Sequence, residues 1–191
     1  AEIGIEFLTL YAFSSENWNR PEKEVNALMT LLVSAINKET KTLMNNNIRL
    51  CTIGDINKLP SKAQKELQEA ITKTKDNTRM TLVLALSYSG RGEIINAVQN
   101  IIKDGKKPEE INEDTFQQYL TTKSVPDPEL LIRTSGEYRI SNFLLWQIAY
   151  SELYFTDTLW PDFRRADLYK AILNYQNRER RFGKTTEQLQ K

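Results

Sequence analysis

The sequence predicts an α/β fold in which a mostly parallel β-sheet is flanked by helices. Short runs rich in β-branched and aromatic residues alternate with longer segments whose apolar residues recur at helical spacing. Hydrophobic residues make up 40% and charged residues 27% of the 191, which is ordinary for a globular chain that buries a core. Because no repeat, low-complexity tract or linker interrupts the chain, we expect one layered domain over residues 1–191.

Five strands are predicted, and the first and most apolar is residues 5–13 (IEFLTLYAF). Residues 48–53 and 80–86 form the second and third, and residues 130–133 and 153–155 form two short ones. Helical segments separate most of these strands. The strands should therefore run parallel and be joined by right-handed crossovers.

Five helices are predicted from apolar residues at helical spacing: residues 21–43, 61–71, 94–101, 112–120 and 168–182. Pro21 opens the first helix, Ser61 and Gln64 form a capping box for the second, and Asn112 caps the fourth. Three arginines lie at the end of the last helix, where they would interact favourably with its dipole: Arg178, Arg180 and Arg181.

Composition limits the chemistry. The 26 basic and 25 acidic side chains give a net charge of +1, so the overall charge of the chain does not indicate binding to nucleic acid. The sequence has no histidine, the commonest general base and metal ligand. Its single cysteine, Cys51, cannot form an intrachain disulfide, which fits a reducing compartment. No apolar stretch is long enough to span a bilayer and nothing resembles a signal peptide, so we expect a cytoplasmic protein.

Polar motifs follow three predicted strands at their carboxyl ends, where parallel α/β sheets bind ligands. They are residues 14–20 (SSENWNR), 87–91 (SYSGR) and 133–142 (RTSGEYRISN). If the strand order permits, the three motifs line one cleft.

The composition of these motifs suits a diphosphate. Three arginines offer forks of N–H donors that match phosphate oxygens: Arg20, Arg133 and Arg139. Ser135, Ser141 and the backbone amides around Gly136 complete a cradle. Three carboxylates lie in or near the motifs: Glu16, Glu137 and Glu152. Carboxylates among phosphates indicate Mg²⁺, so the residues alone predict a phosphorylated ligand bound with Mg²⁺.

Each motif also has a structural interpretation. A single arginine after a strand is more often a surface residue or a salt-bridge partner, and Trp18 could anchor a loop by burying its ring. Glu152 could pair locally, and glycines at a strand–helix turn usually serve packing. The recurrence of such loops at three equivalent sheet positions favours the ligand site.

Residues 8–21 (LTLYAFSSENWNRP) resemble the strand-and-loop signature of the cis-prenyltransferase family almost letter for letter, and most closely that of its bacterial undecaprenyl diphosphate synthases. Residues 127–137 (DPELLIRTSGE) and 139–143 (RISNF) are similar to the family's isopentenyl diphosphate site. Residues 151–155 (SELYF) and 159–163 (LWPDF) continue the similarity, which covers essentially the whole chain.

This resemblance implies a Mg²⁺-dependent enzyme that condenses isopentenyl diphosphate onto an allylic diphosphate such as farnesyl diphosphate. The product would be a long (Z)-polyprenyl diphosphate such as undecaprenyl diphosphate, the lipid-carrier precursor for cell-wall glycans. It also implies a homodimer with peripheral membrane contact, through the lipid product, at the inner face of the membrane.

Site residues carry over by position. Four would hold isopentenyl diphosphate: Arg133, Arg139, Ile140 and Ser141. Five would form the substrate loop: Ser14, Ser15, Glu16, Trp18 and Arg20. Asn17 matches the asparagine assigned to proton removal; because a neutral amide is a poor base, we expect it to orient the diphosphate or the water that accepts the proton. Glu152 matches the magnesium carboxylate, and Ala12 and Phe13 would line the product tunnel.

The chain departs from the family pattern in two ways. The family's N-terminal Asp-Gly-Asn loop, whose aspartate binds magnesium, does not occur in these residues. We therefore expect an N-terminal strand and helix to be missing, and residues 5–13 to keep an uncovered edge or face. Tyr138 stands where many bacterial members have histidine, and Ser87 and Ser89 replace residues of an Asn-Tyr-Gly-Gly-Arg pattern. A histidine-assisted step at Tyr138 is not expected.

Two other functions each account for part of the sequence. A non-catalytic partner subunit of a two-subunit cis-prenyltransferase would explain the absent aspartate loop, but such subunits typically lose the Asn-Trp-x-Arg segment, which residues 17–20 retain. A generic phosphate-binding module leaves the two long signatures unexplained. The sequence therefore favours the enzyme.

Overall fold

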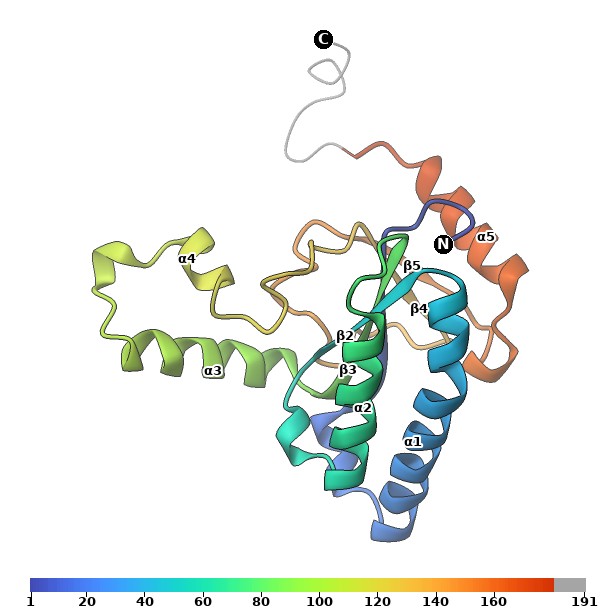
Figure 1. Ribbon diagram of the computed structural model, residues 1–191. Helices are drawn as coiled ribbons and strands as arrows, with labels where there is room; N and C mark the ends of the chain where they lie inside the picture. Colours follow the sequence, from blue (N-terminus) through green and yellow to red (C-terminus); the bar gives the residue numbers. More distant parts are fainter. Residues whose placement is uncertain (181–191) are drawn as a thin grey trace. The chain divides into compact units, whose positions relative to one another are not determined.

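The computed structural model describes residues 1–180, which fall into two compact units. The first unit is Ala1–Pro126, and the second is Asp127–Lys191, described as far as residue 180. Each unit contains parallel strands accompanied by helices, so the predicted fold class is confirmed (Figure 1). A single domain over residues 1–191 stays a prediction.

The first unit is built around a three-stranded parallel sheet with the order β1-β3-β2. Its strands are β1 (Phe7–Ser14), β2 (Ile48–Ile53) and β3 (Met80–Tyr88). Its helices are α1 (Glu22–Asn45), α2 (Ser61–Thr74), α3 (Gly90–Lys103) and the short α4 (Glu113–Gln117). The order places β3 in the middle, where seven of its nine residues are buried. Such a strand is apolar on both faces, as the sequence MTLVLALSY is over most of its length.

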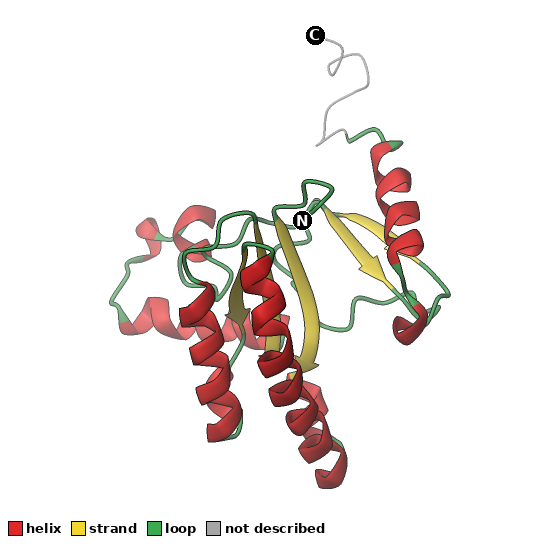
Figure 2. Ribbon diagram, turned by 45° about the vertical axis from the view of Figure 1, so that its right-hand side comes forward, coloured by secondary structure: helices red, strands yellow, loops and turns green. Residues whose placement is uncertain are grey.

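Helices α1 and α2 pack against the sheet and against each other (Figure 2). Their apolar stripes meet Phe13, Leu50 and Leu86 of the three strands in one core cluster. Val25, Met29 and Ile36 from α1 and Ala63, Leu67 and Ala70 from α2 complete it. Their helical spacing in the sequence places these residues on one face of each helix, and that face packs against the sheet.

Strand β1 lies at the edge of this sheet. Of its eight residues only Phe13 is buried, and Leu8 is exposed. The expected uncovered strand is therefore confirmed among the described residues. The ladder between β1 and β3 also shifts register around Ala12, which lies between Tyr11 paired with Ala85 and Phe13 paired with Leu86.

The second unit holds a two-stranded parallel sheet of β4 (Leu130–Arg133) and β5 (Glu152–Phe155). Helix α5 (Arg165–Gln176) packs on β5, and Ala171 in its middle is fully buried. The predicted closing helix is thus shorter than expected: it ends at Gln176, and Arg178 and Arg180 lie beyond it. Arg181 and Phe182 lie outside the described residues.

Two local predictions are wrong. Ser61 is the first residue of α2 rather than its cap, because Pro60 occupies the N-cap position, and Gln64 instead donates to the carbonyls of Asn57 and Leu59. Strand β3 extends through Ser87 and Tyr88, since Tyr88 still pairs with Ser14 of β1. Asn112 does cap α4 as predicted: its Oδ1 accepts a hydrogen bond of 2.9 Å from the Thr115 amide.

No helix among residues 1–180 is both long enough and apolar enough to cross a membrane.

Thr74 links α2 to β2 through a hydrogen bond, and its replacement tests the packing of these two elements. Its fully buried hydroxyl accepts from the Leu50 amide at 3.0 Å and donates to the Ala70 carbonyl at 2.9 Å. Replacing Thr74 by the isosteric valine leaves the Leu50 N–H buried and unpaired, which should lower the free energy of unfolding by about 1–3 kcal/mol. Urea denaturation followed by circular dichroism measures this.

Thr72 is the matched control because it lies on the exposed side of α2 and makes a similar hydroxyl bond to its own helix. Thr72→Val should change the stability by less than about 0.5 kcal/mol. Equal effects of the two substitutions would mean that the contact with Leu50 contributes nothing.

Candidate active site

The segment after β1 folds into a 3₁₀ turn, Ser15–Asn19. Asn17 organises this turn: its side-chain Oδ1 accepts from the Ser14 amide at 2.9 Å, and its carbonyl accepts from the Arg20 amide at 3.1 Å. An asparagine suits this position because its short side chain reaches the backbone of its own turn. The bond fixes the carboxamide and leaves its N–H donors for other groups.

Trp18 ties the same turn to the sheet. Its indole Nε1 donates to the Ser87 hydroxyl of β3 at 2.9 Å, and its ring meets Phe13 edge-on with centroids 4.8 Å apart. The structural interpretation of Trp18 as a loop anchor is therefore correct, and the anchor lies within the predicted substrate loop. Parallel pairing of β1 with β3 places the first two polar motifs side by side, as predicted from their strand ends.

Tyr11 of β1 and Tyr88 of β3 form a further contact between these two strands. The Tyr11 hydroxyl donates to the Tyr88 carbonyl at 3.2 Å, and the two rings meet edge-on at 6.0 Å. Burial, aided by the negative charge of Glu16, raises the pKa of Tyr11 to about 12, although a hydrogen bond with Ser14 acts in the opposite direction. Tyr11 therefore keeps its proton and stays a donor at neutral pH.

Glu93 is a buried carboxylate that sequence reasoning missed. It accepts from the Tyr88 hydroxyl at 2.6 Å and from the Thr121 amide at 2.9 Å, and also from the Thr121 hydroxyl. The sequence carries a weak signal of this, because Glu93 shares with Ala97 and Ile101 the buried side of α3. An acidic residue on the buried side of a helix indicates a buried carboxylate that accepts hydrogen bonds from other parts of the chain.

The remaining residues of the predicted loop lie on its surface. Arg20 forms an exposed ion pair of 2.8 Å with Glu24 of α1, and the Ser15 hydroxyl donates to Glu16 at 3.0 Å. Both of these contacts are exposed to solvent. Ala12 is also exposed, whereas Phe13 lies in the core cluster, 3% exposed.

In the second unit, Arg133 ends β4 with a side chain that is partly buried. Its Nε is buried and has no hydrogen-bond partner within residues 1–180. An unsatisfied buried donor of this kind calls for an explanation such as a ligand or ordered water. The Arg133 carbonyl accepts from the Thr156 amide, so the end of the strand itself is fixed.

The loop after Arg133 is shaped by left-handed backbone. Ser135 and Gly136 have φ of 72° and 65°, and their amides donate to the carbonyls of Thr158 and Thr156. A side chain at Gly136 would also come within 3.2 Å of the Asp157 carboxylate. Ser141 and Asn142 repeat the left-handed conformation with φ of 49° and 62°. Such backbone is costly for residues other than glycine and concentrates at ligand sites.

Arg139, Ile140 and Ser141 follow on this loop. Arg139 is exposed and pairs with Glu137, Ser141 is exposed, and Ile140 is partly buried with its carbonyl accepting from the Phe143 amide. Tyr138 projects into solvent with its ring 5.3 Å from that of Phe155. The loop therefore presents Arg139 and the Ser141 hydroxyl outward.

Glu152 begins β5, and its carboxylate is engaged by Arg178 at 2.7 Å. The structure thus gives Glu152 the local ion pair that was the alternative to a metal role. Among residues 1–180 no three side chains of the types Asp, Glu, Cys or His gather to hold a metal ion. A single carboxylate fits Mg²⁺ only where phosphate oxygens and water supply most of its ligands, which is the usual arrangement for this ion.

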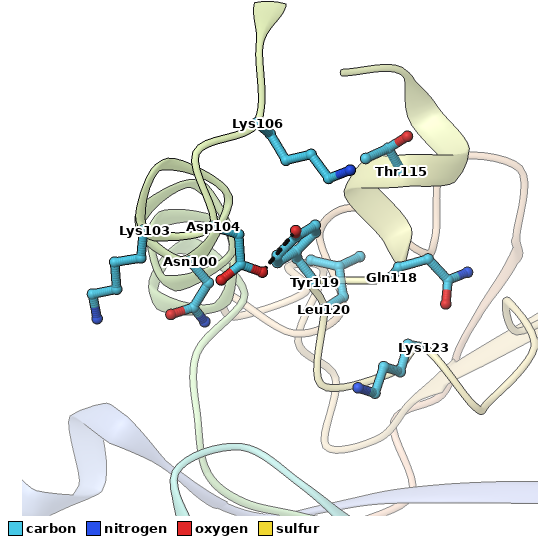
Figure 3. Close-up of a pocket in the computed structure, with 9 residues that line it drawn as sticks. All are labelled: Asn100, Lys103, Asp104, Lys106, Thr115, Gln118, Tyr119, Leu120 and Lys123. Carbon is cyan, nitrogen blue, oxygen red and sulfur yellow. Dashed lines mark hydrogen bonds between the residues drawn. The ribbon is translucent and has the colours of Figure 1, made fainter. Parts of the chain in front are cut away.

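The predicted site residues therefore form two groups, one in each unit. The turn after β1 and the end of β3 come together in the first unit, and the loops after β4 and at the start of β5 belong to the second. A separate hollow of about 630 Å³ lies between α3 and the α4 segment, lined by Asp104, Lys106 and Tyr119 among others (Figure 3). None of its lining residues belongs to the predicted site.

The chain is similar to known proteins over nearly its whole length. The sequence profile of the Prenyltransf family, undecaprenyl diphosphate synthase, matches residues 1–183. The chain is 54% identical to an isoprenyl transferase of Chlorobaculum tepidum, over 99% of this chain and 73% of that protein. It is 52% identical to the farnesyl-diphosphate-specific ditrans,polycis-undecaprenyl-diphosphate synthase of Haemophilus influenzae, over 96% of this chain and 79% of that protein.

Among solved structures, lavandulyl diphosphate synthase from Lavandula x intermedia, in complex with dimethylallyl diphosphate, superposes with a TM-score of 0.92. It is 38% identical, and the match covers 96% of this chain and 81% of that one. The profile match and the relatives that are more than 50% identical over the aligned residues show that the chain belongs to the undecaprenyl diphosphate synthase family of prenyltransferases.

Proposed function

We propose that this prenyltransferase elongates an allylic diphosphate such as farnesyl diphosphate with isopentenyl diphosphate. The product is a long (Z)-polyprenyl diphosphate such as undecaprenyl diphosphate, a precursor of the lipid carrier for cell-wall glycans. The observation that carries the proposal is the 52% identity with the Haemophilus influenzae synthase over 96% of this chain. The protein works as a homodimer in the cytoplasm and meets the inner face of the membrane through its lipid product.

Each elongation step makes one carbon–carbon bond. The allylic carbon–oxygen bond breaks and diphosphate departs with the bonding electrons. The double bond of isopentenyl diphosphate supplies the electron pair for the new carbon–carbon bond, and a proton leaves the adjacent carbon to form the cis double bond. The protein must hold both diphosphates so that the double bond of isopentenyl diphosphate faces the allylic carbon, and it must provide for the departing proton. These are tasks of positioning and charge stabilisation.

Isopentenyl diphosphate binds to the loop of the second unit in this proposal. The buried, unpartnered Nε of Arg133 supports a bidentate contact with its diphosphate. Arg139, Ile140 and Ser141 complete the site, because the Arg139 and Ser141 side chains are exposed on the same loop as Arg133.

The turn after β1 contacts the allylic substrate and the reacting atoms. Asn17 donates hydrogen bonds from its carboxamide to the diphosphate or to the water that accepts the proton, since its Oδ1 is already held by Ser14. The rest of the turn frames the substrate: Ser14, Ser15, Glu16, Trp18 and Arg20. Ala12 and Phe13 line the channel into which the prenyl chain grows.

Glu152 would hold Mg²⁺, for which the substrate phosphates would supply further oxygen ligands. The ion neutralises phosphate charge when it is bound. Arg178 contacts one oxygen of this carboxylate, Oε2, at 2.7 Å, so Glu152 would hold the ion with its other oxygen or after releasing Arg178. The ion pair is partly buried: the Glu152 side chain is 27% exposed and the Arg178 side chain is 30% exposed.

Arg133 generates the first test. Arg133→Ala in the full-length enzyme removes a charge-assisted bidentate contact, worth roughly 1.5–3 kcal/mol, so the KM for isopentenyl diphosphate should rise about tenfold or more. Arg164→Ala is the control, because Arg164 is an exposed arginine of the same unit whose guanidinium donates to the carbonyl of its neighbour Phe163. An unchanged KM in Arg133→Ala, measured in steady-state assays, would remove Arg133 from the substrate site.

Ala12 tests the product channel. Because Ala12 is exposed, Ala12→Leu should cost little stability, but its larger side chain should obstruct the growing chain and shorten the product without abolishing the first condensation. Chromatography of radiolabelled products decides this. Ala166→Leu, at an exposed position of α5, should leave the product length unchanged. Products of full length from Ala12→Leu would place the channel elsewhere.

Glu152 tests the metal site against the ion pair. Glu152→Gln should lower the activity, and excess Mg²⁺ should partly restore it, because a neutral amide binds the ion more weakly. Arg178→Gln removes the other half of the ion pair but keeps the carboxylate, so it should not raise the Mg²⁺ concentration needed for half-maximal rate. Identical Mg²⁺ dependence in the two variants would show that only the ion pair matters.

A further inference from the structure

Ser87 has no role in the proposed chemistry, yet its conformation is unusual. It is the penultimate residue of β3, it is buried, and its backbone has a φ of 48°. Serine seldom adopts this left-handed conformation, which persists only where surrounding contacts impose it. Such a position inside a paired strand therefore calls for an account of what holds it.

Contacts on both sides hold Ser87. On the β2 side, its carbonyl accepts a long hydrogen bond of 3.4 Å from the Asp55 amide. On the β1 side, its hydroxyl accepts the indole N–H of Trp18 at 2.9 Å. Ser87 thus joins the carboxyl ends of all three strands of the first unit, and Trp18 is the only side chain that binds its hydroxyl among residues 1–180.

Trp18 transmits this contact to its neighbour Asn17. Both belong to the same five-residue 3₁₀ turn, in which the Asn17 carboxamide is held by Ser14 on one side and the Trp18 ring rests on Phe13 on the other. The Ser14 bond ties the turn to β1. The bond from Trp18 to Ser87 supplies the second fixed point, on the neighbouring strand.

We propose that Ser87 is a positioning residue for the condensation: by accepting the Trp18 indole N–H, it fixes the direction in which Asn17 presents its carboxamide. This inference rests on the proposed function, in which Asn17 touches the reacting groups. It assigns to Ser87 an effect on the chemical step rather than on binding at Arg133. Loss of the acceptor should therefore lower kcat and leave the KM for isopentenyl diphosphate unchanged.

Three substitutions separate the hydroxyl from the backbone strain. Ser87→Gly removes the acceptor but suits a positive φ, and Ser87→Asn suits a positive φ while supplying an acceptor oxygen. Ser87→Ala removes the acceptor and keeps the strain. Loss of one neutral hydrogen bond predicts a kcat about fivefold lower in Ser87→Gly, with recovery in Ser87→Asn. Trp18→Phe removes the donor, so adding Ser87→Gly to it should cause no further loss.

A substrate-free readout tests the bond itself. The chain has three tryptophans, so a nitrogen–proton spectrum shows three indole N–H signals, and Trp18→Phe identifies the one that belongs to Trp18. In Ser87→Gly this signal should shift and exchange with solvent faster, while in Ser87→Asn it should stay protected. Thermal denaturation of each variant checks that the fold is retained.

The outcomes are distinct. An indole signal that does not respond to Ser87→Gly overturns the hydrogen bond, and a response without any fall in kcat overturns the positioning role. A rise in the isopentenyl diphosphate KM equal to the fall in kcat also contradicts it, because that pattern indicates general damage. If wild-type protein makes no polyprenyl diphosphate, the proposed function fails, while the indole measurement still decides whether Ser87 holds Trp18.

Discussion

Pairing of β3 with a parallel strand on each side is the constraint on which the first unit depends. Leu84 of β3 lies opposite Leu10 of β1 and Thr52 of β2, so all three strands advance together and end at one edge. The chain leaves that edge three times, after Ser14, after Ile53 and after Tyr88. Backbones come very close there: a side chain at Gly54, where φ is 100°, would sit 2.2 Å from the Leu86 carbonyl. Only glycine fits this approach.

The two units fix their polar groups by different means. In the first unit, hydrogen bonds between partly buried groups hold Asn17, Trp18 and Tyr11 to the sheet. In the second, Arg139 and Glu152 are held by ion pairs with Glu137 and Arg178. The Arg139–Glu137 pair is the more exposed of the two, and exposed ion pairs contribute only about 0–1 kcal/mol, so Arg139 exchanges its partner for a diphosphate at little cost. The first arrangement suits groups that must not move, and the second suits groups that release one partner to take another.

Strand and helix positions were largely predictable because burial imposes a period on the sequence. The strands over residues 48–53 and 130–133 were predicted to the residue, since each is an apolar run bounded by polar residues or a turn. Helix starts were less predictable. Ser61 looked like a cap by residue type, but Pro60, with its φ of −55°, already occupies that place. The sequence places the end of β3 two residues too early. Tyr88 belongs to the strand through its pairing with Ser14, which is 74 positions away in the sequence.

Residue type alone nominated Arg133 for the candidate site, whereas Asn17 was nominated by its match to the family's motif. The supporting contacts of the site were not predictable. Glu93 meets Thr121 across 28 positions and Tyr11 meets Tyr88 across 77, so no local pattern announces either contact. The partner of Glu152 was equally hidden, because Arg178 lies 26 positions further on and comes close only when the chain past α5 folds back beside β5.

The pairing of β1 with a strand made much later has a consequence for synthesis on the ribosome. Phe7 pairs with Thr81, so about 70 residues must follow before β1 finds its neighbour. At translation rates of about 5–20 residues per second, that delay lasts about 4–15 s. Throughout it an apolar segment with an unpaired edge is outside the ribosome and open to other nascent chains, whereas α1 gains its hydrogen bonds from adjacent residues as it emerges. Slower translation of residues 22–80 would lengthen this interval, and with it the time during which the unpaired edge of β1 is open to another chain.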